Sequence, residues 1–176
     1  MKEITIGKFK FQKCWTFPED VSKFLNRMIT RYNKNYWDEK ELCWKKPPIC
    51  HVCCGESKIG EIRVDINSEV NPTILADAWS LSNILKEQTM IILDPPWQIN
   101  WRDRQLLSYE MRDCLKIGGI LIQNSPWSPW CIGMKILAVW KVSPHFNNYS
   151  DLRDWWILRK QFQPTIKKSN TAQLLS

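Results

Sequence analysis

The chain has 176 residues, of which 44% are hydrophobic and 24% are charged, as is typical of one globular domain. This length excludes two domains of ordinary size, and no apolar stretch reaches the ~20 residues that a membrane-spanning helix needs. Lys and Arg outnumber Asp and Glu by 25 to 18, which gives a net charge of +7. A basic excess favours polyanionic partners such as nucleic acids, although a solvated charged face would give the same balance.

The seven cysteines argue against a disulfide framework, because their number is odd and the sequence gives no sign of secretion. Residues 1–13 alternate charged and apolar side chains and lack the central apolar block of a signal peptide. We therefore expect a soluble, cytoplasmic protein with no membrane partner. Cys50 and Cys53 form a C-x-x-C pattern, but no second ligand pair at similar spacing accompanies it, so we expect no metal site.

The first 48 residues hold eleven Lys or Arg against six acids. Residues 3–15 predict one or two short strands. Pro18 and the acids after it favour a helix start, and apolar residues at helical spacing continue to residue 32. The basic and aromatic stretch that follows ends in Lys45 and Lys46, which we expect to contact nucleic-acid phosphates. We interpret residues 1–48 as a basic extension packed on the main domain.

Short apolar runs begin at Ile49 and predict a mostly parallel sheet, because successive runs each end on a polar residue. The expected strands are residues 49–53, 61–66, 74–76, 90–93, 120–123, 135–142 and 155–159. Residues 104–116 predict a helix that Gly118 and Gly119 would end. Ligands of parallel sheets lie at the carboxyl ends of the strands, so polar residues there are the candidate site. We expect the main domain to span residues 49–163 and residues 164–176 to form a flexible tail.

The most informative motif follows the strand expected at residues 90–93 and consists of Asp94, Pro95, Pro96 and Trp97. The two prolines have no backbone N–H, so at these positions the backbone offers hydrogen-bond acceptors and no donors. The Asp94 carboxylate and the Pro95 carbonyl can share the two protons of an amino group on a purine or pyrimidine. Trp97 can stack on the base. A tight turn with a buried Trp is the structural alternative.

Asp94-Pro95-Pro96-Trp97 resembles the catalytic tetrapeptide of the S-adenosylmethionine-dependent amino-methyltransferases that act on nucleic-acid bases. In that family the first position is Asp, Asn or Ser, the last is aromatic, and Asp is most associated with adenine N6. The resemblance covers about residues 49–160 and implies S-adenosyl-L-methionine as the cofactor, with these four residues as the catalytic set. It also implies an α/β, three-layer, Rossmann-like class I methyltransferase fold, whose mostly parallel seven-stranded sheet has a terminal antiparallel hairpin.

The same resemblance assigns a cofactor site upstream of the motif. Residues 51–60 resemble the family's cofactor loop, in which a glycine lets the backbone approach the ligand. Asp65 matches the acid that binds the ribose hydroxyls, and Asp77 with Ala78 matches the pair near the cofactor adenine. Either Asp can instead cap a helix. The expected cofactor-binding residues are Cys53, Gly55, Ser57, Asp65, Ile66, Asp77 and Ala78. Only nine residues separate Gly55 from Asp65, so the first crossover helix must be very short or absent.

Eleven tryptophans are many for 176 residues, and we expect most of them in the core. Trp97, Trp101, Trp127 and Trp130 instead lie in expected loops at strand ends, where aromatic rings can stack on an extracted base. The expected substrate-binding residues are Trp97, Trp101, Trp127, Lys45 and Lys46.

Together these features predict a methyltransferase that modifies an exocyclic amino group of a nucleic-acid base, with adenine N6 in DNA favoured. The alternatives are an RNA methyltransferase acting on guanine N2 or adenine N6, and a catalytically inactive nucleic-acid-binding subunit of the same fold. The sequence contains no separate target-recognition domain. Target specificity would then come from loops, the basic extension, a homodimer or a partner subunit.

Overall fold

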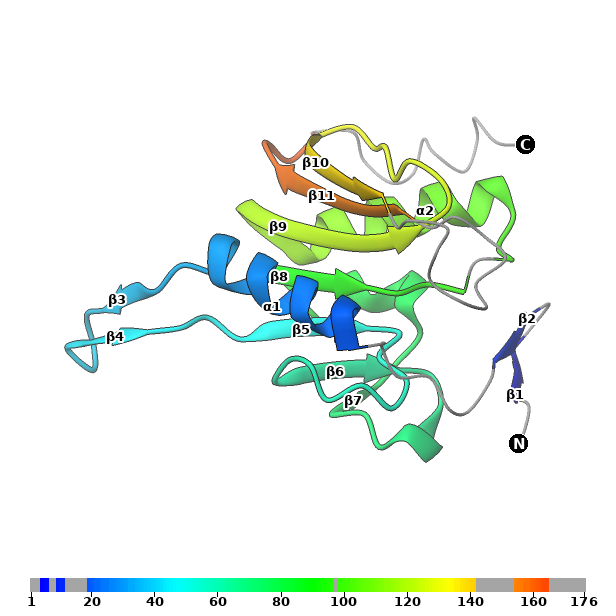
Figure 1. The fold of residues 1–176 in the computed structure, drawn as a ribbon, viewed down its shortest axis with the longest axis horizontal. Coiled ribbons are helices and arrows are strands. Elements are labelled where there is room, and N and C mark those ends of the chain that lie inside the picture. Colours follow the sequence, from blue (N-terminus) through cyan, green and yellow to red (C-terminus); the bar gives the residue numbers. More distant parts are fainter. Residues whose placement is uncertain (1–3, 7–8, 12–18, 97, 142–153, 165–176) are drawn as a thin grey trace.

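The computed structural model describes residues 4–6, 9–11, 19–96, 98–141 and 154–164 (Figure 1). The strands of the main sheet are β5 (Ile49–Val52), β6 (Ile62–Asp65), β7 (Ile74–Leu75), β8 (Gln88–Leu93), β9 (Leu115–Ser125), β10 (Met134–Lys141) and β11 (Asp154–Lys160). They lie in the order β10-β11-β9-β8-β5-β6-β7. β11 runs antiparallel to both of its neighbours, whereas β9, β8, β5, β6 and β7 are parallel. The predicted mostly parallel seven-stranded sheet with a terminal antiparallel hairpin is confirmed.

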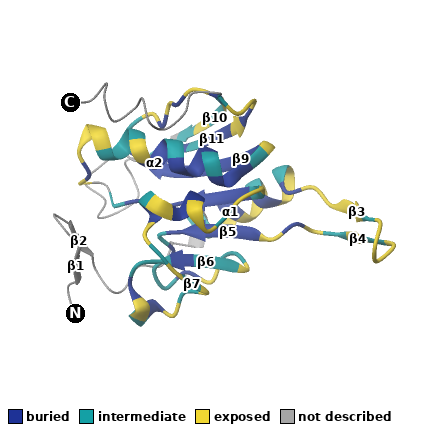
Figure 2. Ribbon diagram, turned by 180° about the vertical axis from the view of Figure 1, so that it is seen from behind, coloured by how far each residue is buried: buried dark blue, intermediate teal, exposed yellow. Residues whose placement is uncertain are grey.

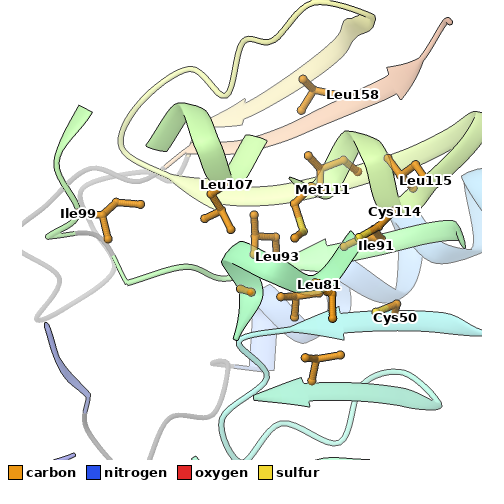
Figure 3. Packing of buried hydrophobic residues seen from close by; sticks show 14 residues of the cluster. Cys50, Leu81, Ile91, Leu93, Ile99, Leu107, Met111, Cys114, Leu115 and Leu158 are labelled. Atoms are coloured by element: carbon orange, nitrogen blue, oxygen red, sulfur yellow. The ribbon is translucent and has the colours of Figure 1, made fainter. Parts of the chain in front are cut away.

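Helices cover both faces of this sheet and make three layers. The helices are α1 (Glu19–Tyr32), α2 (Trp101–Cys114) and the short 3-10 helices η1 (Ser68–Val70) and η2 (Ala78–Asn83). Side chains of β8 alternate between two cores, because successive residues of a strand point to opposite faces. Met90 and Ile92 pack with α1, whereas Ile91 and Leu93 pack with α2 and η2. Figure 3 shows this second core, in which Leu93 lies close to Leu107 of α2.

Helix α1 is part of the core through three buried side chains, Phe24, Leu25 and Ile29. The Phe24 ring stacks on Trp140 of β10, with 4.0 Å between the ring centroids. These residues follow the helical spacing that the sequence predicts for this segment. One face of the sheet is therefore covered by a helix that precedes its first strand in the chain.

Two small antiparallel hairpins precede the main sheet. The first pairs β1 (Ile4–Ile6) with β2 (Phe9–Phe11), where the sequence predicts short strands. The second pairs β3 (Tyr36–Asp38) with β4 (Cys43–Lys45) and extends away from the sheet with mostly exposed residues (Figure 2). Neither helix α1 nor any other described helix is long and apolar enough to cross a membrane.

Helix α2 differs from the helix predicted at residues 104–116, and this prediction was wrong at both ends. Asn100 caps the helix by accepting a hydrogen bond from the Asp103 N–H at 3.0 Å, so the helix begins three residues earlier. At the other end, Leu115 has extended dihedrals because it pairs with Gln88 of β8. Gly118 does not end the helix but lies within β9, where the register to β8 shifts. Strand pairing therefore outweighs the local helix-stop signal.

The connection from β5 to β6 confirms the absence of a crossover helix that the short spacing predicts. Residues 53–61 contain turns and bends, and none of these residues is helical. The chain returns over the α1 face of the sheet, where Ile59 is half-buried against the same core as α1. Gly60 passes so close to β5 that an added Cβ would lie 2.8 Å from the Ile49 carbonyl oxygen.

Gly60→Ala is expected to destabilise the fold by about 3 kcal/mol, because it combines a backbone clash with a φ of +87° that side chains disfavour. Gly118→Ala is the matched control. Gly118 has a φ of +81°, but nothing lies within 4 Å of its added Cβ, so only the backbone cost of about 1–2 kcal/mol remains. Urea unfolding measures both values. Equal losses in the two variants would contradict the close approach at Gly60.

His51 of β5 lies under this return segment and is fully buried. Its Nδ1 lies 3.3 Å from the Ile59 carbonyl oxygen. Burial lowers the pKa of His51 from 6.5 to about 4. In the unfolded chain His51 takes up a proton below about pH 6.5, whereas in the folded chain it does so only near pH 4. The free energy of unfolding therefore decreases as the pH is lowered through this window.

We expect the free energy of unfolding to fall by about 2 kcal/mol between pH 7.5 and pH 5 on account of His51. Urea unfolding at a series of pH values measures this fall. A His51→Gln variant should lose this part of the pH dependence whatever its absolute stability. Parallel pH profiles for the parent and the variant would show that His51 is protonated equally in both states.

Candidate active site

The order of the strands reverses between β5 and β8, and the predicted site residues lie at this point. β5 continues into β6 and β7 on one side, while β8 and β9 lie on the other (Figure 1). In open parallel sheets, ligands bind outside the carboxyl ends of the strands at such a reversal. Cys53 directly follows β5 and Asp94 directly follows β8. The Asp94 N–H donates to the Val52 carbonyl at 3.3 Å, which joins the two strand ends.

Asp65, at the end of β6, organises the loop after β5. Its Oδ2 accepts a hydrogen bond from the Gly55 N–H, and its Oδ1 accepts one from the Asn67 N–H, both at 2.9 Å. Each carboxylate oxygen can accept a second hydrogen bond. The carboxylate therefore has the capacity to accept ribose hydroxyls in addition to its two backbone donors.

Cys53 has a strained backbone and an acidic environment. Its φ of +56° costs a residue with a side chain about 1–2 kcal/mol, and such strain is concentrated at functional sites. Burial raises the pKa of the Cys53 thiol well above its ordinary value, and the negative charges of Asp65, Asp94 and Asp77 raise it further. The thiol therefore stays protonated, and the loop lies in a negative potential that favours a cationic ligand.

The remaining predicted cofactor residues lie in this loop, directly after β6 and at the start of η2. Ser57 is buried, and its Oγ accepts a hydrogen bond from the Ile59 N–H at 3.3 Å, whereas Ile66 is half-buried immediately after β6. Asp77 is exposed and caps η2 by accepting from the Trp79 N–H at 3.0 Å, which is the alternative role considered for it. Ala78, the first residue of η2, is buried in the core.

Asp94 is only 9% exposed, and its carboxylate is hydrogen-bonded to a residue that the sequence analysis missed. The Asn124 Nδ2 donates a hydrogen bond to the Asp94 Oδ1 at 3.0 Å. Pro95 is buried and Pro96 half-buried beside it, while Trp97 lies outside the described residues. Asn124 follows a predicted strand adjacent to that of Asp94, and this polar residue at a buried strand end was the available signal.

The predicted base-stacking tryptophans differ in what surrounds them. Trp101 opens α2 and is 63% exposed, so its ring is open to a ligand. Trp127 is half-buried against the core, and the Arg104 guanidinium lies 4.4 Å from its ring centroid. The guanidinium covers one face of the Trp127 ring, so a base cannot stack on that face. Trp130, in the same loop, is 59% exposed.

Lys45 and Lys46 do not come together with the other candidate site residues. Lys45 ends β4, which leads into the amino end of β5, whereas Asp94 lies at the carboxyl end of β8 (Figure 1). The Lys45 Nζ forms ion pairs with Glu41 and Asp38, and these carboxylates raise its pKa. Its charge is thus balanced within the β3–β4 hairpin. The expected phosphate contacts of this pair are not part of the site described here.

No protein-family model matches the sequence, and no curated protein matches it. Among solved structures, yhhF from Escherichia coli, a candidate methyltransferase, aligns with 92% of this chain and 100% of its own, with a TM-score of 0.54 and 9% identity. TrmN from Thermus thermophilus aligns with 49% of this chain and 27% of its own, with a TM-score of 0.40 and 18% identity. This chain thus spans about a quarter of TrmN.

SMU.1697c from Streptococcus mutans, a candidate methyltransferase solved in complex with SAH, aligns with 55% of this chain and 68% of its own, with a TM-score of 0.37 and 11% identity. Of these three likenesses, the one to yhhF extends over nearly the whole chain. It shows that the chain has the same α/β fold as that candidate methyltransferase.

Proposed function

We propose that the protein is an S-adenosylmethionine-dependent methyltransferase that acts on an exocyclic amino group of a nucleic-acid base, adenine N6 in DNA. The observation that carries this proposal is the position of Asp94-Pro95-Pro96. The segment follows β8 at the reversal of strand order, beside the loop after β5, where three aspartates place a negative potential at Cys53. A structural turn would need neither the carboxylate nor this location.

The loop after β5 fits the proposed cofactor by charge. S-adenosylmethionine carries a positive sulfonium, and Asp65, Asp94 and Asp77 together place a negative potential at Cys53. In this proposal, Gly55 adjoins the methionine part of the cofactor and Asp65 accepts its ribose hydroxyls. Asp77 and Ala78, at the start of η2, lie near its adenine. The raised pKa of Cys53 argues against a thiolate nucleophile at this position, which agrees with direct transfer of the methyl group to the target nitrogen.

The bound cofactor supplies an electrophilic methyl group on sulfur. The protein's own contribution is to hold the target nitrogen. The Asp94 carboxylate and the Pro95 carbonyl accept hydrogen bonds from the two N–H groups of the target amino group. The nitrogen lone pair then stays available to the methyl carbon. With the cofactor bound, transfer of its methyl group to this lone pair would leave a neutral thioether, and the surplus proton on the nitrogen would pass to water. Positioning and charge lower the barrier.

Nucleic acid is the proposed substrate because of charge and exposed aromatics. The chain carries a net charge of +7, which favours binding to phosphates. Trp101 and Trp130 are exposed and lie on the segments that follow β8 and β9, where they can stack on an extracted base. Trp97 is proposed to share this role.

Transfer of a labelled methyl group from S-adenosylmethionine to unmethylated DNA and to RNA tests the proposal. We expect label in DNA when the full chain is present. Label in RNA alone would replace DNA by the RNA alternative. If the cofactor binds but neither polymer is labelled, the chain is instead an inactive nucleic-acid-binding subunit, and the enzymatic proposal fails.

A further inference from the structure

Asn124 lies beside Asp94 because of the register between β8 and β9. Leu93 pairs with Gln123 in this parallel ladder, so the next residues along the two strands, Asp94 and Asn124, are lateral neighbours. On its other side, Asn124 pairs with Trp155 of β11. The amide is therefore placed by two strand pairings at once, and all three strands lie inside the sheet and not at its edges.

The side chain of Asn124 is 5% exposed and has one polar contact that explains its presence. Its Nδ2 donates to the Asp94 Oδ1 at 3.0 Å. Among the described residues, no hydrogen bond reaches the Asn124 Oδ1. Burying an amide costs free energy unless it is hydrogen-bonded, and an apolar side chain at this position of β9 would avoid that cost. The amide is thus accounted for by Asp94.

A donor fixed on the sheet has two effects on a neighbouring carboxylate. It sets the torsion of the carboxylate, so the remaining acceptor positions keep one direction. It also favours the ionised form, which accepts hydrogen bonds and donates none. A target amino group has two N–H donors and needs such a partner.

We propose that Asn124 is a positioning residue: it holds the Asp94 carboxylate in the orientation that accepts a hydrogen bond from the target amino group. This inference rests on the proposed methyltransferase function. Asn124 acts through Asp94 and does not itself touch the substrate.

The test introduces leucine at two adjoining positions of β9. Asn124→Leu removes the donor to Asp94, whereas Gln123→Leu removes a buried amide whose Nε2 instead donates to the Ser125 Oγ at 3.3 Å. With both variants folded, Asn124→Leu should lower kcat by about tenfold or more and leave cofactor affinity and the KM for nucleic acid within about twofold. Gln123→Leu should keep kcat within about twofold of the parent. Equal kcat values in the two variants would overturn the positioning role.

A second measurement does not depend on activity. Urea unfolding of Asn124→Leu, Asp94→Ala and the double variant forms a double-mutant cycle. Asn124→Leu leaves a buried carboxylate without its hydrogen-bond donor only when Asp94 is present. We therefore expect the two substitutions to be coupled by about tenfold in the unfolding constant. If the parent is active and the coupling factor is close to one, the positioning role of Asn124 is overturned and the proposed function is not. A parent that transfers no methyl group overturns the proposed function, and the positioning role falls with it even when the coupling is found.

Discussion

Asp94→Ala is expected to lower the rate of methyl transfer by two orders of magnitude or more, while the chain still folds and still binds the cofactor. In the proposed reaction the carboxylate acts on the target amino group, which is no part of the cofactor, so its loss would remove an interaction of the transition state. Asp94 lies at the end of β8 rather than in the core, so the sheet keeps its packing. Single-turnover transfer, calorimetry with S-adenosylhomocysteine and thermal melting measure the three properties.

Asp94→Asn is the matched variant for this effect. Its amide oxygen still accepts a hydrogen bond but brings no full charge, so we expect partial activity between those of the parent and Asp94→Ala. If the rate of Asp94→Ala stays close to that of the parent, the Asp-Pro-Pro segment is a structural turn.

Asp65→Ala is expected to weaken the binding of S-adenosylmethionine and S-adenosylhomocysteine by tenfold or more. The ribose loses a charge-assisted pair of hydrogen bonds worth about 1.5–3 kcal/mol. The variant also releases the Gly55 and Asn67 N–H groups, which the carboxylate now holds. Both effects act on the same loop, and both reduce affinity. Isothermal titration calorimetry measures the change.

Asp113→Ala is the control for a general effect of losing a hydrogen-bonded aspartate. Asp113 is bound by Arg112 and Gln163 and belongs to the last turn of α2, which leads into the amino end of β9. Its loss should leave cofactor affinity within about twofold. Unchanged affinity in Asp65→Ala would remove Asp65 from the cofactor site.

The sheet could be predicted from the sequence because its signals are local and repeated. Each parallel strand is a short apolar run, and a polar residue such as Asp65 or Asp94 follows it. The short spacing between Gly55 and Asp65 was enough to predict the missing crossover helix. Chain order and strand type therefore fix most of the topology, and the candidate site follows from the polar residues at the strand ends.

The error at the carboxyl end of α2 comes from an interaction between distant parts of the chain. Gly118 carries a helix-stop signal, but the pairing of Leu115 with Gln88 ends the helix earlier. The phosphate contact of Lys45 stays a prediction, and the structure adds that Asp38 and Glu41 of its own hairpin form ion pairs with it. Residue type alone does not determine which partner a charge or a strand finds.

Asn124 and Trp127 illustrate the same limit within the site. Asn124 could be found only through the register of β8 and β9, which places it opposite the residue after Leu93. Trp127 is in the expected loop, but Arg104 covers one face of its ring. The base-stacking role of Trp97 stays a prediction, because this residue lies outside the described part of the chain.

Nucleoside mass spectrometry of unmethylated DNA after incubation with the full chain and S-adenosylmethionine tests the central claim most directly. The account predicts N6-methyldeoxyadenosine in the sample with the parent and its absence in the sample with Asp94→Ala. A methyl group on a ring carbon, a ring nitrogen or the sugar would contradict the account, because Asp94 and Pro95 are assigned to hold an exocyclic amino group.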